Sequence, residues 1–209
     1  MRDDRYITTD DIPDIGIVVI EYIDLCSKKH SGLLKEGSDK AAKIDEKLAN
    51  LNQLLLKTGT FDEVYKSVTG FINHTYASGY PDQYTLSACG KAVVAKEELE
   101  KALIESKASD LIILSQQQQE AIVAGDQEAH DLAYQTLYDT CLTYRNEGSL
   151  DKVGKVLDAK LGELQDTTDF PSPAEADKIL ATENAIRNVY GVIDSLPDQN
   201  QMTFEDFIQ

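Results

Sequence analysis

The apolar residues in the stretch 41–55 recur at steps of three and four, and this spacing constrains the fold more than any other feature of the chain. Such a period predicts a helix that buries one stripe of side chains against a neighbouring helix. The stripe continues toward the N-terminus, so the sequence predicts a long helix over 15–57. Gly32 and Gly37 lie in its middle, and each glycine costs a helix about 1 kcal/mol relative to alanine. A kink or a break is therefore expected near 30–38.

A second long helix is predicted over 86–124, where good helix-forming residues continue without a proline. Its glutamine run at 116–119 is interpreted as a neutral, solvated face. We expect the two long helices to lie antiparallel and in contact. The residues predicted to form the packing seam between them are Ile44, Leu48, Leu51, Leu55, Leu99, Leu103, Leu111 and Leu114. Ile104, Ile112 and Ile113 widen the apolar face, and this extra strip is either covered by the rest of the chain or left as an interface.

The segment 61–85 between the long helices is predicted to be a small cap over their ends. It opens with a capping box formed by Thr60 and Glu63 and closes with turn residues at 78–84. Its aromatic residues are Phe61, Phe71, Tyr76, Tyr80 and Tyr84. These side chains are interpreted as half-buried packing residues rather than as the lining of a ligand pocket, because tyrosine is common in such positions.

The stretch 125–209 is predicted to hold further helices, with breaks at Gly125 and Gly148 and a capping box at Ser172 and Glu175. No stretch has the alternation of a strand, so the predicted fold is all-α: a long antiparallel, coiled-coil-like hairpin with additional C-terminal helices forming a bundle. The expected organisation is a flexible arm at 1–14, the hairpin at 15–124 with its cap at 61–85, and an acidic helical region at 125–209 that packs on the hairpin.

The net charge of −17 is unevenly distributed, since residues 1–124 hold 20 acidic and 14 basic residues and residues 125–209 hold 17 and 6. A chain this acidic is a poor partner for nucleic acid. No apolar run approaches the roughly 20 residues of a membrane helix, and no secretory signal is recognisable. Three widely spaced cysteines are typical of small buried side chains in a reducing compartment. We therefore expect a cytoplasmic protein, or one exported without a cleavable signal peptide.

No pattern of catalytic or cofactor-binding residues is recognisable. Cys26 and His30 lie four residues apart and can share a helix face, but a zinc site needs three or four ligands. A packed cysteine near a half-exposed histidine is the preferred interpretation. The chain has no phosphate-binding glycine loop, and its three histidines leave little scope for a nucleophile–histidine pair. The sequence therefore predicts no catalytic residue, no cofactor-binding residue and no metal ligand.

The two long predicted helices carry a resemblance to a known family. The first ends IDEKLANLNQLLL, the second reads KALIESKASDLIILSQQQQEAI, and a short irregular segment separates them. Over residues 15–124 this arrangement resembles the helical hairpin of type III secretion needle-tip and filament (translocator) proteins. The resemblance implies an antiparallel coiled coil and a role in a secretion apparatus outside the cell.

Three functional interpretations follow. The first is a non-enzymatic helical protein that assembles with itself or with a protein partner, such as a type III secretion tip or filament-like component. The second is a cytosolic adaptor, chaperone or effector that binds a protein partner through its acidic C-terminal helices. The third is a helical-bundle enzyme with an inconspicuous carboxylate or tyrosine site.

Overall fold

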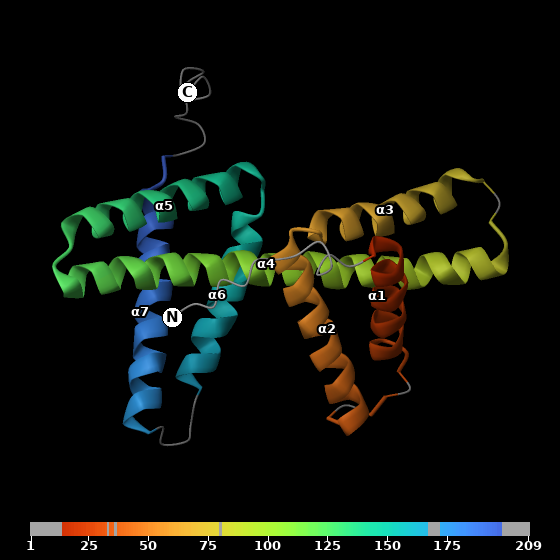
Figure 1. The fold of residues 1–209 in the computed structure, drawn as a ribbon, viewed down its shortest axis with the longest axis horizontal. Helices are drawn as coiled ribbons and strands as arrows, with labels where there is room; N and C mark the ends of the chain where they lie inside the picture. Colours follow the sequence, from red (N-terminus) through yellow and green to blue (C-terminus); the bar gives the residue numbers. More distant parts are fainter. Residues whose placement is uncertain (1–13, 33, 36, 80, 167–171, 198–209) are drawn as a thin grey trace, which may run out of the picture. The chain divides into compact units, whose positions relative to one another are not determined.

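The computed structural model describes residues 14–32, 34–35, 37–79, 81–166 and 172–197. These residues form helices and no strand, which confirms the all-α prediction and the packing of helices into bundles (Figure 1). The helices are α1 (Ile15–Lys29), α2 (Asp39–Thr58), α3 (Phe61–Ala77), α4 (Gln83–Ala124), α5 (Gln127–Asn146), α6 (Leu150–Gln165) and α7 (Pro173–Ser195). The expected arm at 1–14 lies outside the described residues except for Asp14, whose carboxylate caps α1.

The chain divides into two compact units, at 1–102 and 103–209. Unit 1 contains α1, α2, α3 and residues 83–102 of α4, and unit 2 contains the rest of α4 with α5, α6 and α7. Unit 1 holds 17 acidic and 13 basic residues, a net charge of −4, whereas unit 2 holds 20 and 7, a net charge of −13. The negative charge of the chain is therefore concentrated in unit 2.

The predicted helix over 15–57 is wrong as a single element, because α1 ends at Lys29 and α2 begins at Asp39. Gly32 and Gly37 have φ angles of 68° and 73°, in the left-handed region that glycine adopts without steric cost. The Ser38 side chain then caps the new helix by accepting a hydrogen bond from the backbone of α2. A break in the anticipated 30–38 stretch thus converts one expected helix into two helices that pack on each other (Figure 1).

The segment expected to be a small cap is mostly α3, a 17-residue helix packed on α1 and α2. Its N-terminal residue Phe61 is buried, and so are Val64, Val68 and Ile72 at helical spacing. The predicted capping box is wrong here, because the Thr60 side chain makes no cap hydrogen bond and instead meets the Thr58 hydroxyl at 2.8 Å. The corresponding prediction at the start of α7 is confirmed, with both hydrogen bonds of the box present.

An ion-pair cluster joins α1, α2 and α4 within unit 1. Lys29 Nζ lies 3.2 Å from a carboxylate oxygen of Asp45 and 3.3 Å from one of Glu98. His30 Nε2 lies 3.0 Å from the other Glu98 oxygen. Burial alone would raise the pKa of Glu98, but hydrogen bonds and charge from His30 and Lys29 outweigh it and hold that pKa below its usual value. The carboxylate form of Glu98 therefore stabilises unit 1.

We expect Glu98→Gln to lower the free energy of unfolding by about 1–3 kcal/mol at pH 7, since it leaves charged donors without their acceptor. The folded-state pKa of Glu98 lies below the unfolded one, so its contribution is present above the unfolded pKa and disappears as the pH falls through the folded pKa. The difference between the native and variant melting temperatures should thus shrink as the pH falls below the usual glutamate pKa of about 4.3. Glu97→Gln, at an exposed neighbour, is the matched control. A constant difference down to pH 2 would contradict the assignment.

The core of unit 2 forms where α4, α5, α6 and α7 meet. Its buried members are Ala108, Leu111, Ile112, Leu137, Cys141, Val153, Leu157, Ala185, Ile186, Val189 and Val192. Of the extra isoleucine strip on α4, Ile112 is buried in this core and Ile104 packs against it, whereas Ile113 is exposed. The rest of the chain therefore covers most of the strip, which is the first of the two outcomes anticipated for it.

A line of hydrogen-bonded polar side chains crosses this core. The buried Ser115 hydroxyl donates to the carbonyl of Ala185 at 2.9 Å. The Asn188 amide donates to Ser115 Oγ at 2.9 Å and to Gln118 Oε1 at 2.7 Å. Gln118 Nε2 in turn lies 3.2 Å from His130 Nε2 on α5. The glutamine run is therefore not uniformly solvated. Gln118 is buried, and its amide forms hydrogen bonds with His130 on α5 and with Asn188 on α7.

Candidate functional site

The reactive side chains of the described residues are placed for packing. Cys26, Cys89 and Cys141 are buried and free. Burial, with a smaller effect from the charge of Glu98, raises the pKa of Cys26 to about 12, and burial raises that of Cys141 to about 11. Both thiols therefore stay protonated at neutral pH. Among the described residues, no group of three or more histidine, cysteine, aspartate or glutamate side chains can hold a metal ion. His30 faces Glu98 instead.

The predicted seam residues are divided between the two units. Five of them belong to unit 1 and three to unit 2. In unit 1, Leu48, Leu55 and Leu99 are buried, whereas Ile44 and Leu51 are half-buried. In unit 2, Leu111 is buried, whereas Leu103 and Leu114 are half-buried. Each unit thus holds both buried and half-buried seam positions, and none of the buried ones is available to a partner.

An exposed apolar groove lies in unit 1 between α1, α3 and the start of α4. It has a volume of about 480 Å³. Its lining residues, called the apolar groove below, are Val19, Ile20, Ile23, Phe71, Tyr84, Ser87, Ala88 and Lys91. Ile20 is 71% exposed, Tyr84 88% and Phe71 39%. The aromatic residues expected to be half-buried packing residues therefore divide, since Phe61 is buried whereas Phe71 and Tyr84 line a groove.

A second groove in unit 1 lies where α1 ends and α2 begins. It has a volume of about 390 Å³, and its lining residues, called the lysine groove below, are Lys28, Ser31, Leu34, Lys40, Lys43 and Ile44. Leu34 and Ile44 are half-buried, and the lysines are exposed. Lys28 pairs with Asp24 at 2.5 Å. Within the described part of the chain, neither Lys40 nor Lys43 has an ion-pair partner. The surface that lines this groove is apolar, because the lysines contribute the aliphatic stems of their side chains to it.

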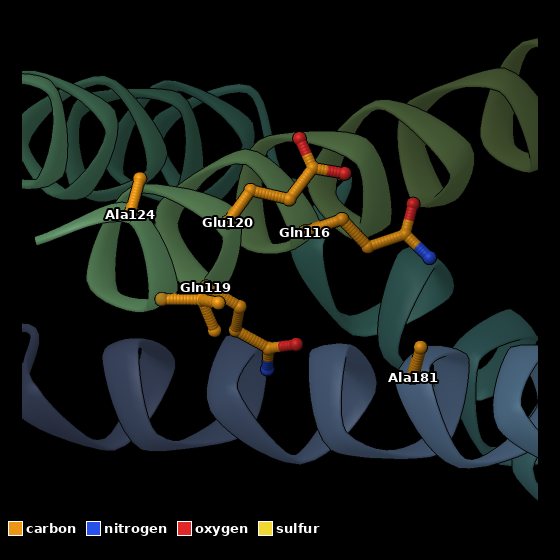
Figure 2. Close-up of a pocket in the computed structure, with 6 residues that line it drawn as sticks. Gln116, Gln119, Glu120, Ala124 and Ala181 are labelled. Carbon is orange, nitrogen blue, oxygen red and sulfur yellow. The ribbon is translucent and has the colours of Figure 1, made fainter.

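A third groove, with a volume of about 510 Å³, lies in unit 2 between the end of α4 and α7. Its lining residues, called the glutamine groove below, are Gln116, Gln119, Glu120, Val123, Ala124 and Ala181. Figure 2 shows the Gln119 side chain extended toward α7 and the Glu120 carboxylate directed away from that helix. Val123 is almost fully exposed. The amides and the small apolar residues offer hydrogen bonds and contact surface to a protein segment, but no reactive group.

None of the three grooves was predicted as a site from the sequence. The apolar groove has a sequence signal, since Val19, Ile20 and Ile23 are more apolar residues than one helix stripe can bury. The aromatic residues of 71–84 are a second signal, because aromatic side chains can line a pocket as well as pack in a core. The lysine groove depends on the break between α1 and α2, which brings Lys28 near Lys40 and Lys43. A continuous helix would have kept them apart.

Comparisons of this chain with protein-family models, with characterised proteins and with solved structures found no match. Among the described residues, no helix is both long enough and apolar enough to cross a bilayer.

Proposed function

We propose that this chain is a non-enzymatic helical protein that works by self-association, and that the apolar groove of unit 1 is its main contact surface. The observation that carries the proposal is the exposure of Ile20 and Tyr84 beside Phe71 in one groove. Large apolar side chains gathered on a surface mark interaction sites more often than isolated ones do. A groove of this kind accepts the apolar face of an amphipathic helix.

A second copy is the partner that the surface composition favours. Unit 2 also exposes large apolar side chains, at Ile122 and Val123 of α4, Leu132 of α5 and Leu180 of α7. A contact between the apolar groove of one copy and these exposed apolar residues of unit 2 in the next copy is heterologous, because the two surfaces differ. Such contacts produce rings or open filaments rather than simple dimers.

In its specific form, the proposed function is that of a tip or filament-like component of a type III secretion apparatus. An open filament, which is one product of a heterologous contact, would fit it, whereas the division of 15–57 into α1 and α2 removes one of the two long helices on which the resemblance rests. The proposal therefore depends on the apolar groove rather than on a coiled-coil hairpin. The proposal allows the chain to act inside the cell, or outside it after export.

Sedimentation velocity across a hundredfold range of protein concentration tests the proposal. The weight-average sedimentation coefficient should rise with concentration. The rise should be larger at high salt, because copies with a charge of −17 repel each other and because salt shortens the screening length from about 10 Å at 0.1 M to about 3 Å at 1 M. A strict monomer at every concentration and salt level would contradict the proposal.

The glutamine groove supports a second candidate, the cytosolic adaptor, chaperone or effector. That groove lies in the acidic unit 2, and its amide side chains can bind the backbone of a partner segment. Substitution of Gln119 by lysine, with native self-association retained, separates the two functions. If Gln119→Lys loses binding to an identified partner protein while it self-associates as the native chain does, that result favours the adaptor function.

A further inference from the structure

The hydrogen-bonded side chains that cross the core of unit 2 are ordered in one direction. They are Ser115, Asn188, Gln118 and His130, called the polar line below. The line begins at the carbonyl oxygen of Ala185, which can only accept a hydrogen bond, so the Ser115 hydroxyl donates to it. Ser115 Oγ has no second hydrogen and therefore accepts from the Asn188 amide nitrogen, at 2.9 Å. One backbone carbonyl thus sets the orientation of the first two side chains.

The same reasoning extends to the other end of the polar line. The Asn188 amide nitrogen has a second hydrogen, which it donates to Gln118 Oε1 at 2.7 Å. The Gln118 amide nitrogen is therefore the atom that faces His130 Nε2, at 3.2 Å. Because an amide nitrogen only donates, His130 Nε2 must accept, and a histidine ring has an acceptor nitrogen only when it is neutral. The polar line accordingly requires the neutral tautomer of His130 that carries its hydrogen on Nδ1.

The charged groups on α5 fit this tautomer. Asp131 Oδ1 lies 3.0 Å from His130 Nδ1, and hydrogen bonds from His130 and Gln127 hold the pKa of Asp131 below its usual value. Asp131 is thus a carboxylate that accepts from Nδ1, and at 67% exposure its attraction for a positive ring is weakened by solvent. His130 is the fourth residue of α5, near the helix N-terminus, where the helix dipole disfavours positive charge.

The surroundings of the ring outside α5 add little charge. The ring shares a cavity of about 150 Å³ with Ala121 and Ile122 of α4, which are apolar, and with Asp126. The Asp126 carboxylate is already used as the cap of α5, where it accepts from the backbone nitrogen of Ala129. From α7, the polar line reaches the ring only through neutral amides.

Protonation of His130 would place a hydrogen on Nε2, directly opposite the hydrogens of the Gln118 amide. Turning the Gln118 amide over removes this conflict but sets its nitrogen against the nitrogen of Asn188. Turning Asn188 over as well sets its oxygen against Ser115, whose hydroxyl must then leave the carbonyl of Ala185. Every arrangement loses a hydrogen bond of the line, and Ser115 and Gln118 are buried, where such a loss is costly.

We propose that the polar line makes His130 a proton-sensitive contact between α5 and the helices α4 and α7: the neutral ring completes the line, and protonation of the ring breaks it. The inference does not depend on the proposed self-association. The folded chain then binds this proton less readily than the unfolded chain, in which the ring has no such neighbour. Unit 2 therefore gains stability from this contact at about pH 8 and loses it as the pH falls toward about pH 5, the range in which histidine changes charge.

Nitrogen-15 NMR of the histidine rings in the full-length chain tests the tautomer. The His130 signals are identified by their absence from the spectrum of His130→Gln. At about pH 8, above the histidine range, the ring should carry its hydrogen on Nδ1 and none on Nε2. A hydrogen on Nε2 at this pH would overturn the inference, because the Gln118 amide would then lack its acceptor.

Hydrogen exchange of the backbone amides of residues 131–137 tests the response to pH. Between about pH 8 and about pH 5, their protection in the native chain should fall about threefold or more beyond the fall in His130→Gln, since a glutamine oxygen accepts from Gln118 but does not titrate. His74→Gln, which removes an exposed histidine of unit 1, is the matched control and should respond as the native chain does.

Asn188→Ala separates the polar line from the ring alone. Without Asn188, the Gln118 amide can turn over and present its oxygen to a protonated ring, so the response to pH should shrink to that of His130→Gln. An undiminished response in Asn188→Ala, or equal falls in protection for the native chain and His130→Gln, would overturn the inference. Circular dichroism at both pH values establishes that each variant is folded.

Discussion

Replacing Leu111 by alanine is expected to lower the free energy of unfolding of unit 2 by about 2–5 kcal/mol. Leu111 is fully buried in the core of unit 2, where it meets side chains of the other helices. The substitution removes the transfer free energy of the lost methyl and methylene groups and leaves a cavity that the neighbouring helices fill only in part. Urea unfolding followed by circular dichroism measures the loss, and hydrogen exchange assigns it to unit 2.

Leu114→Ala is the matched control, because it makes the same chemical change three residues later on the same helix. Leu114 is only half-buried, so the expected loss is about 1 kcal/mol. Equal losses at the two positions, or a loss below 1 kcal/mol for Leu111→Ala, would contradict the placement of α4 in the core. Leu103, a predicted seam residue, is also half-buried and should behave like Leu114.

The second large effect is expected from Asn188→Ala, which should lower the free energy of unfolding by about 1–3 kcal/mol. The Asn188 amide donates to both Ser115 and Gln118, and these two acceptors lie in the core. Without the amide, the buried Gln118 oxygen loses the hydrogen bond that Asn188 donates to it, in a region of low polarity where an unsatisfied polar group is costly.

Asn184→Ala provides the control for this prediction, since Asn184 lies one turn earlier on α7 and is exposed. Its replacement should change the free energy of unfolding by no more than about 0.5 kcal/mol. Thermal unfolding of both variants beside the native chain is sufficient. If Asn188→Ala were as stable as Asn184→Ala, the hydrogen-bonded line across unit 2 would not contribute to its stability.

The period of apolar residues predicted the helices well. The predicted helix over 86–124 corresponds to α4, and breaks at Gly125 and Gly148 correspond to its end and to the end of α5. Glycine was also the reason for the main error. Gly32 and Gly37 predict a kink or a break. The presence of glycine does not determine whether the chain continues in the same direction after the break or folds back on itself.

The sequence does not predict which helices pair, because every amphipathic helix has an apolar stripe that can pack on any neighbouring helix. Leu99 and Leu111 have the same period on α4 but are buried in different units. The same limit applies to the grooves. Tyr84 and Ile20 are distant in sequence, and only the packing of α4 on α1 brings them to one surface.

The burial of polar residues in unit 2 was not predicted from the sequence, for a related reason. Gln118 belongs to a run of four glutamines that suggested a solvated face, and its neighbour Gln117 is indeed exposed. Burial of Gln118 depends on partners from α5 and α7, which a local pattern does not contain. The hydrogen bond between Ser115 and Asn188 was not predicted from the sequence either, because no local pattern connects these two positions.

Self-association through the apolar groove is tested most directly by sedimentation velocity of two variants beside the native chain. Ile20→Ser combined with Tyr84→Ser removes the two most exposed apolar side chains of the groove, and Tyr76→Ser removes a tyrosine that is 69% exposed but does not line it. The predicted result is at least a tenfold weaker association for the groove variant, equivalent to about 1.4 kcal/mol or more, and an unchanged association for Tyr76→Ser. Equal association of all three chains would contradict the assignment of the groove as the contact surface.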